Sequence, residues 1–231
     1  MPAGILERDG LNLTKKYRNG TKSKPSKRGM ANYKYHPCVI GLDQSYSRCG
    51  ISIAVEGELK KVSSIKYNGL NTKTEKRVEL QRVLRKAIQS CLKNFNSDQV
   101  IVLCERLRLF STNQGQSTIR PGVIKPAAAM IAYIVDTAAE FGIEVWSVDT
   151  RAWKSEVLGD SRPVFEPIEG VKNPQKFGSV RKVIELGFRD SLEIVRGNGK
   201  GKVISLDDDA ADSACIALYG NCKKPKLKRE L

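Results

Sequence analysis

The order of apolar segments in the first two thirds of the chain constrains the fold more than any other feature of this sequence. Three short segments rich in Val and Ile come first: CVIGLD at 38–43, ISIAVEG at 51–57 and LKKVSSIKY at 59–67. Turn-length polar pieces separate them, so they predict a meander of three antiparallel strands. From residue 74 to residue 92, apolar side chains recur every three or four positions. This spacing predicts an amphipathic helix with Thr72 or Thr74 available as its cap.

Helices and buried strands alternate after this point. The segments VIVLCE at 100–105 and IEVWSV at 143–148 are continuous apolar runs, as expected of strands buried on both faces. Helices are expected at 126–142, 150–158, 175–186 and 207–219, with a Pro-rich loop at 160–174. Three antiparallel strands followed by this alternation predict an α/β fold in which the later strands run parallel to the first.

Charge is distributed unevenly along the 231 residues, which carry a net charge of +15. Residues 1–36 hold +7 and residues 222–231 hold +4, and neither stretch has hydrophobic periodicity. We expect a mostly disordered basic arm at 1–36, a single globular domain at 37–221 and a basic, likewise disordered tail at 222–231. The basic ends would suit attraction to nucleic acid, but they are equally consistent with solubilising tails.

Composition excludes several classes of function. No apolar run approaches the roughly 18–20 residues that span a bilayer, and the N-terminus lacks a signal-peptide pattern, so a soluble intracellular protein is expected. The six cysteines form no C-x-x-C pair, which argues against zinc and favours reduced thiols. Because His36 is the single histidine, catalysis by a Ser–His or Cys–His pair is discounted. Trp146 and Trp153 fall in or beside apolar elements and are expected in the core.

Carboxylates stand at the ends of apolar segments in a chain with surplus positive charge. Asp43 ends the first strand and Glu105 ends the fourth, while Asp209 and Asp212 are three residues apart on the last helix. Parallel first and fourth strands would place Asp43 beside Glu105, and residues three apart share one face of a helix. Each carboxylate alone has an ordinary interpretation as a turn former, a surface ion pair or a helix-capping charge. Their combination is the informative feature.

Converging carboxylates repel one another unless a cation lies between them. Hard divalent ions with oxygen ligands, Mg²⁺ above all, suit such a cluster. Two ions about 3.5–4 Å apart would allow hydrolysis of a phosphodiester. The residues therefore predict metal-dependent phosphodiester chemistry, provided that the carboxylates meet in space.

Four segments, in this order and at approximately this spacing, resemble the RuvC-type Holliday-junction resolvases of the RNase H-like nuclease superfamily. They are VIGLDQSYSRCGISIA, VIVLCERLRL, GIEVWSVDTRAWKSEVLG and DDDAADSACIALYG, and they cover most of residues 37–221. The resemblance implies a five-stranded mixed sheet, with three antiparallel and two parallel strands, flanked by helices. It also implies a homodimeric endonuclease that nicks four-way DNA junctions symmetrically during recombination or the resolution of replication intermediates.

The resemblance assigns roles to individual residues. Asp43 and Glu105 match the family's acids on the first and fourth strands. Asp209 and Asp212 match its D-A-A-D pair, which selects Asp209 over the two aspartates before it. These four residues would hold two Mg²⁺ ions, with Mn²⁺ as a substitute. Lys154 looks like the family's lysine near the scissile phosphate, although a solvated lysine on a short helix is an equal alternative.

Polar and basic residues after Glu105 are candidates for contact with DNA. The candidates are Arg106, Arg108, Phe110, Arg120, Lys125 and Lys154. The family has an aromatic residue shortly after its glutamate, whereas here two arginines come first and Phe110 is displaced. Together with the basic arm, this departure suggests a phage or mobile-element version, acting in a bacterial or phage-infected host cytoplasm. The alanine-rich helix at 126–142 is the candidate dimer contact, or else it packs on the sheet.

Two alternatives stay open from the sequence. Another RNase H-like nuclease, acting on RNA–DNA hybrids or on branched or flap DNA, would keep the metal site and change the substrate. A catalytically silent DNA-binding protein would keep the fold without converging carboxylates.

Overall fold

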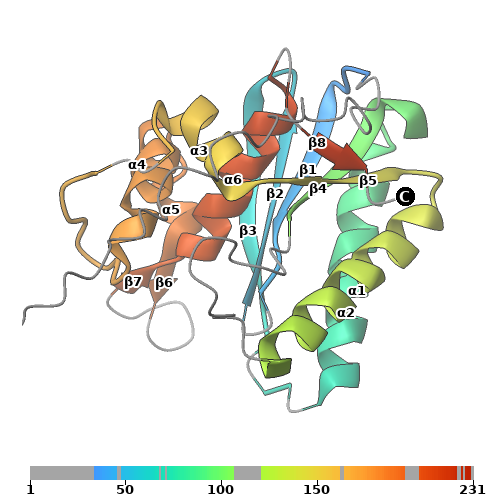
Figure 1. The fold of residues 1–231 in the computed structure, drawn as a ribbon, viewed down its shortest axis with the longest axis horizontal. Coiled ribbons are helices and arrows are strands. Elements are labelled where there is room, and N and C mark those ends of the chain that lie inside the picture. The colour runs from blue at the N-terminus through green and yellow to red at the C-terminus, as the bar shows by residue number, and fades with distance from the viewer. Residues whose placement is uncertain are drawn as a thin grey trace, which may run out of the picture.

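A mixed β-sheet forms the centre of the molecule (Figure 1). The computed structural model describes residues 34–45, 48–67, 69–70, 72–106, 121–161, 164–195, 203–222, 225 and 227–229, with the backbone alone for 121–127 and 228. The strands, in spatial order, are β3 (Glu58–Lys66), β2 (Arg48–Val55), β1 (Cys38–Asp43), β4 (Val100–Glu105), β5 (Glu144–Val148) and β8 (Leu227–Arg229). The first three are antiparallel, and β1, β4 and β5 are parallel. The predicted five-stranded mixed sheet is confirmed.

Strand β8 extends the sheet and lies in the C-terminal tail, so the expectation of disorder is wrong for residues 227–229. It pairs antiparallel with β5, and Arg229 Nη2 lies 2.6 Å from Glu144 Oε1. The segment carries no strand-like pattern of its own, because it belongs to the basic stretch after residue 222. Pairing with an existing edge strand supplies the hydrogen bonds that the local sequence does not specify.

Helices cover both faces of the sheet (Figure 1). On one face lie α1 (Lys73–Cys91) and α2 (Pro121–Ala139), and on the other lie α3 (Thr150–Leu158), α4 (Phe177–Glu185) and α6 (Asp208–Gly220). The short helix α5 (Arg189–Leu192) and the hairpin of β6 (Glu193–Val195) and β7 (Val203–Leu206) complete the second layer. No helix in the described part of the chain is both long and apolar enough to cross a bilayer.

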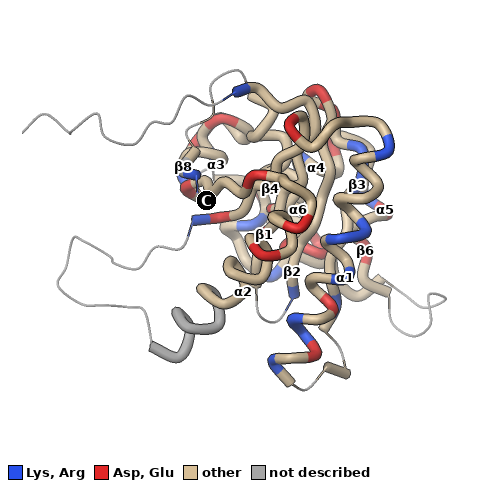
Figure 2. Tube along the Cα trace, turned by 90° about the vertical axis from the view of Figure 1, so that its right-hand side faces the viewer, with Lys and Arg blue, Asp and Glu red and all other residues tan. Residues whose placement is uncertain are grey.

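Helix boundaries follow their caps. Thr72, rather than Thr74, caps α1 through a reciprocal capping box with Glu75, and residues of both charges lie along this helix (Figure 2). Helix α2 begins at Pro121, five residues before the predicted start, because a proline is favoured in the first helical turn. The helix predicted at 175–186 is divided into a 3₁₀ turn, Pro174–Lys176, and α4.

Helix α6 lies with its backbone almost directly on β1 and β2. A Cβ atom at Gly41 would collide with the carbonyl oxygen of Ser213, and one at Gly50 would collide with that of Asp209. Glycine is therefore required at both strand positions. This close approach brings the first turns of α6 to the ends of β1 and β2, where the candidate site forms.

Candidate active site

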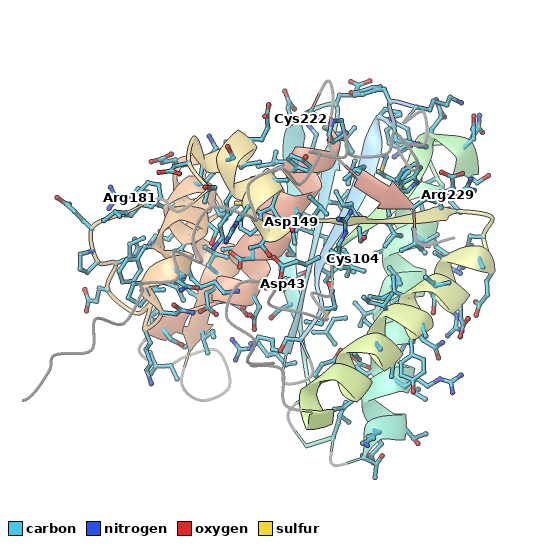
Figure 3. The ribbon with its side chains drawn as sticks, viewed as in Figure 1. Asp43, Cys104, Asp149, Arg181, Cys222 and Arg229 are labelled. Atoms are coloured by element: carbon cyan, nitrogen blue, oxygen red, sulfur yellow. The ribbon has the colours of Figure 1, made fainter. Side chains whose placement is uncertain are left out.

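The predicted carboxylates come from three elements that meet at one edge of the sheet. Asp43 and Glu105 end the parallel neighbours β1 and β4, where Leu42 pairs with Cys104. Asp209 and Asp212 project from the start of α6. Figure 3 shows Asp43 between the sheet and the helical layer that contains α6. Asp43 and Asp212 are 8% and 5% exposed, so two of the four carboxylates are largely removed from water.

A lysine that the sequence did not single out lies at the centre of this cluster. Lys176 Nζ is 3.1 Å from Asp43 Oδ2, 3.6 Å from Asp209 Oδ1 and 2.5 Å from Asp212 Oδ2. Three carboxylates from two elements thus share one ammonium group. The available signal was only a lysine after a Pro-rich loop, and a loop without periodicity does not reveal which way its side chains point.

The charges of the cluster are strongly coupled. The pKa of Asp43 is raised to about 7, chiefly by burial; Lys176 opposes the rise, and Asp212, Glu105 and Asp209 contribute to it. Burial also raises the pKa of Asp209. For Lys176, burial would lower the pKa, but Asp212 and Asp43 outweigh it and hold the pKa above its ordinary value. One ammonium group therefore does not fully compensate the carboxylates around it.

Glu105 is held in place by two neighbours. The side-chain amide of Gln44 donates to the carbonyl oxygen of Glu105 and accepts from its N–H at 3.0 Å, which continues the pairing of β1 with β4 past Asp43. The indole N–H of Trp153 donates to Glu105 Oε1 at 3.3 Å. Trp153 is fully buried, as predicted, but its polar atom is directed to a candidate metal ligand.

The residues of the cluster fit a divalent cation. Asp212 Oδ1 is buried and has no hydrogen-bond partner among the described residues. A buried carboxylate oxygen without a donor is costly, and a cation would satisfy it. Asp43, Glu105, Asp209 and Asp212 offer oxygen ligands only, which is the donor set of Mg²⁺ or Mn²⁺.

A second acidic group lies beside this one. Ligand oxygens of Asp207, Asp208 and Asp209 lie within 4.8 Å of one another. Asp207, however, is already engaged: it caps α6 by accepting from Ala210 N at 3.1 Å, accepts from Ser64 Oγ at 2.5 Å and lies 3.4 Å from Arg48 Nη1. We therefore regard Asp207 as an anchor of α6 and Asp209 as the member that faces the cluster.

The remaining candidates have different positions. Lys154 Nζ donates to the carbonyl oxygen of Gln175 at 3.1 Å and lies over the Trp153 ring, so the structure places Lys176, and not Lys154, at the carboxylates. Arg106 directly follows Glu105 and its backbone N–H bonds Val148 O. Arg108, Phe110 and Arg120 lie outside the described residues, and only the backbone of Lys125 is described, in α2.

Comparison with known proteins finds the fold in solved structures only. No family profile matches the sequence, and no curated protein matches it. RuvC from Thermus thermophilus is similar at 16% identity and a TM-score of 0.52, covering 83% of this chain and 99% of that one. T. thermophilus RuvC in complex with a Holliday junction substrate is similar at 15% identity and a TM-score of 0.54, and the match covers 84% of this chain and 99% of that one. The yeast mitochondrial Holliday junction resolvase Ydc2 is 17% identical with a TM-score of 0.44, and the match covers 82% of this chain and 80% of that one.

The class of fold follows from the two Thermus thermophilus matches together with the sheet order. The chain has the RNase H-like fold of the RuvC resolvases, with an acidic cluster at the edge where β1 and β4 end.

Proposed function

We propose that this protein is a metal-dependent endonuclease that cuts four-way DNA junctions. The observation that carries the proposal is the convergence of Asp43, Asp209 and Asp212 on one buried point, with Glu105 adjacent. A catalytically silent DNA-binding protein gives no reason to bury several carboxylates together, because uncompensated buried charge is costly. The RuvC-type fold supports the same activity.

Asp43, Glu105, Asp209 and Asp212 would hold two Mg²⁺ ions, or Mn²⁺ in their place. Bound there, the ions would supply Lewis-acid activation of water and stabilise charge on the leaving oxygen. Gln44 and Trp153 keep Glu105 oriented toward the cluster. The Lys176 ammonium group partly compensates the carboxylates before an ion binds and would supply a positive charge near the phosphate afterwards.

The junction is the proposed substrate, and a homodimer in the cytoplasm is the proposed acting form. A structure of T. thermophilus RuvC was solved with a Holliday junction substrate, and two active sites related by a two-fold axis suit the near-symmetry of such a junction. An enzyme that cuts RNA–DNA hybrids or flaps would use the same carboxylates. A comparison of junction, hybrid, flap and linear duplex cleavage in Mg²⁺ separates these substrates.

The decisive test is cleavage of a synthetic mobile junction by wild type, Asp212→Asn and Asp208→Asn. We expect Asp212→Asn to lose cleavage by orders of magnitude and to keep junction binding, because the metal ligand is lost while less negative charge repels DNA. Asp208→Asn is the matched control on the same helix turn and should cleave like wild type. Wild-type turnover by Asp212→Asn would overturn the proposed site. Loss of activity in Asp208→Asn alone would move the metal to the group formed by Asp207, Asp208 and Asp209.

A further inference from the structure

A pocket lies beside the acidic cluster, against α3 and the end of β5. Its volume is about 520 Å³, and its lining includes Arg106, Asp149, Arg151, Ser155, Ser161 and Leu227. Figure 3 shows Asp149 between α3 and the sheet. The buried side chain of α3, Trp153, contacts Glu105 instead. Helix α3 therefore separates the acidic cluster from this pocket.

The two arginines of the pocket differ from most arginines in the described part of the chain. Ion pairs with described carboxylates are made by Arg48, Arg82, Arg85, Arg189 and Arg229. Arg106 and Arg151 make none with any described residue, and Arg106 Nε is buried with no described hydrogen-bond partner. An unsatisfied buried donor is destabilising, so the Arg106 guanidinium is available for an acceptor other than the described residues.

The chemistry of the lining selects an anion with several oxygens. Two guanidinium groups match phosphate geometry, and the hydroxyls of Ser155 and Ser161 add neutral donors. The one acid of the pocket, Asp149, is turned to its own helix, where Oδ1 accepts from Arg151 N at 2.9 Å. Two arginines that form no ion pair with any described residue disfavour a metal cation in this pocket.

We infer that the pocket binds a backbone phosphate of the DNA strand next to the phosphate that is cut. The inference rests on the proposed function. Arg106 is the residue after Glu105, and consecutive Cα atoms are about 3.8 Å apart, so the pocket begins one residue from the acidic cluster. Arg151 and Ser155 are exposed, which leaves the pocket open to a polymer that continues past it. The contact would fix the register of the strand and read no base.

The test measures junction binding without divalent ions, over a series of salt concentrations, for wild type, Arg106→Gln, Arg151→Gln and Arg85→Gln. Arg85 is the control because it is exposed and paired with Glu140 on the opposite face of the sheet. We expect each pocket variant to bind more weakly by about tenfold or more, because each loses a hydrogen bond from a charged donor to a phosphate oxygen. The slope of log K against log salt should fall by about 0.9 for each lost phosphate contact. Arg85→Gln should match wild type.

Neutral methylphosphonate linkages, placed one at a time along the junction, identify the phosphate itself. In wild type, one position beside the cut should weaken binding, and the same substitution should have no further effect on Arg151→Gln. The phosphate site would be rejected if all three variants, Arg106→Gln, Arg151→Gln and Arg85→Gln, had the same salt slope. If wild type still cut junctions in that case, the proposed function would be unaffected. If the two pocket variants had reduced salt slopes but wild type cut no branched DNA, the proposed nuclease function would be rejected and the phosphate site would be retained.

Discussion

Trp153 illustrates how one residue can serve both the core and the site. Its ring is fully buried in the cluster formed with β4 and α6, and its single polar atom donates to Glu105 Oε1. Metal ligands in proteins are oriented by such donors, and loss of an orienting partner typically costs 10–100-fold in metal affinity. The sequence predicted burial of Trp153 from its apolar neighbours, but the direction of an indole N–H depends on tertiary packing.

Replacing Trp153 by Phe should weaken metal binding while leaving most of the packing. We expect the Mg²⁺ concentration for half-maximal cleavage to rise about tenfold, and thermal stabilisation by Mg²⁺ without DNA to decrease in parallel. Trp146→Phe is the matched control, since the indole N–H of Trp146 donates to Glu144 Oε2 at 2.8 Å and Glu144 is not one of the four carboxylates of the acidic cluster. If both variants respond to Mg²⁺ like wild type, the Trp153 N–H does not orient the ligand.

At the scale of elements, the site depends on how closely α6 approaches the sheet and on how the turn before α4 is placed. Gly41 and Gly50 allow the backbone of α6 to approach, and Asp207 fixes its first turn to Arg48 and Ser64. The 3₁₀ turn Pro174–Lys176 then directs the lysine into the cluster. Lys154 bonds the carbonyl oxygen of Gln175 and so holds this turn one residue before Lys176.

Lys176→Met should destabilise the metal-free protein by about 3 kcal/mol at pH 8, because breaking a buried ion pair leaves uncompensated charge. In the folded state the pKa of Asp43 is about 7, above its ordinary value. From about pH 4 to 7 the folded state therefore binds more protons than the unfolded state. Because of this difference, the contribution of Asp43 to the free energy of unfolding falls as pH rises. Without Lys176 that pKa rises further. The difference in Tm between variant and wild type should therefore widen from pH 5 to pH 8.

Magnesium gives this variant a second readout. Since the lysine and a divalent ion compensate the same carboxylates, Mg²⁺ should raise the Tm of Lys176→Met more than that of wild type at pH 8. Lys60→Met, which removes an exposed lysine that pairs with Glu58 on β3, is the control and should show no such gain. A pH-independent difference, with equal Mg²⁺ stabilisation of both proteins, would contradict the role of Lys176 as a counter-ion.

The sequence predicts those features that neighbouring residues determine, and it misses those that depend on contacts between distant parts of the chain. Strand-end acids such as Asp43 and Glu105 are visible because apolar runs end on them, and the parallel direction of the later strands follows from the alternation of helices and strands. Lys176 was missed because its position is set by contacts across the fold. The same reason explains β8 and the β6–β7 hairpin, which are short and gain their order from pairing.

At the scale of the whole molecule, charge is divided between the ends of the chain and the domain. The two ends hold most of the net +15, whereas the site concentrates carboxylates inside a nearly balanced domain. Non-specific attraction and chemistry would then reside in separate parts of the sequence. Phosphate contacts by basic residues increase affinity in a salt-dependent way without reading sequence.

Deleting residues 1–34 should therefore lower affinity for a junction and for linear duplex by similar factors, and reduce the salt slope for both. The positions of the cuts should not change, because the carboxylates and the pocket at Arg106 and Arg151 remain. The deletion removes the exposed Lys34–Asp98 ion pair, which contributes little to stability, so the Tm should be almost unaffected. The measurements are anisotropy titrations at several salt concentrations and mapping of cleavage products. An unchanged salt slope would show that the arm does not contact DNA, and shifted cuts would give it a part in selecting the site of cleavage.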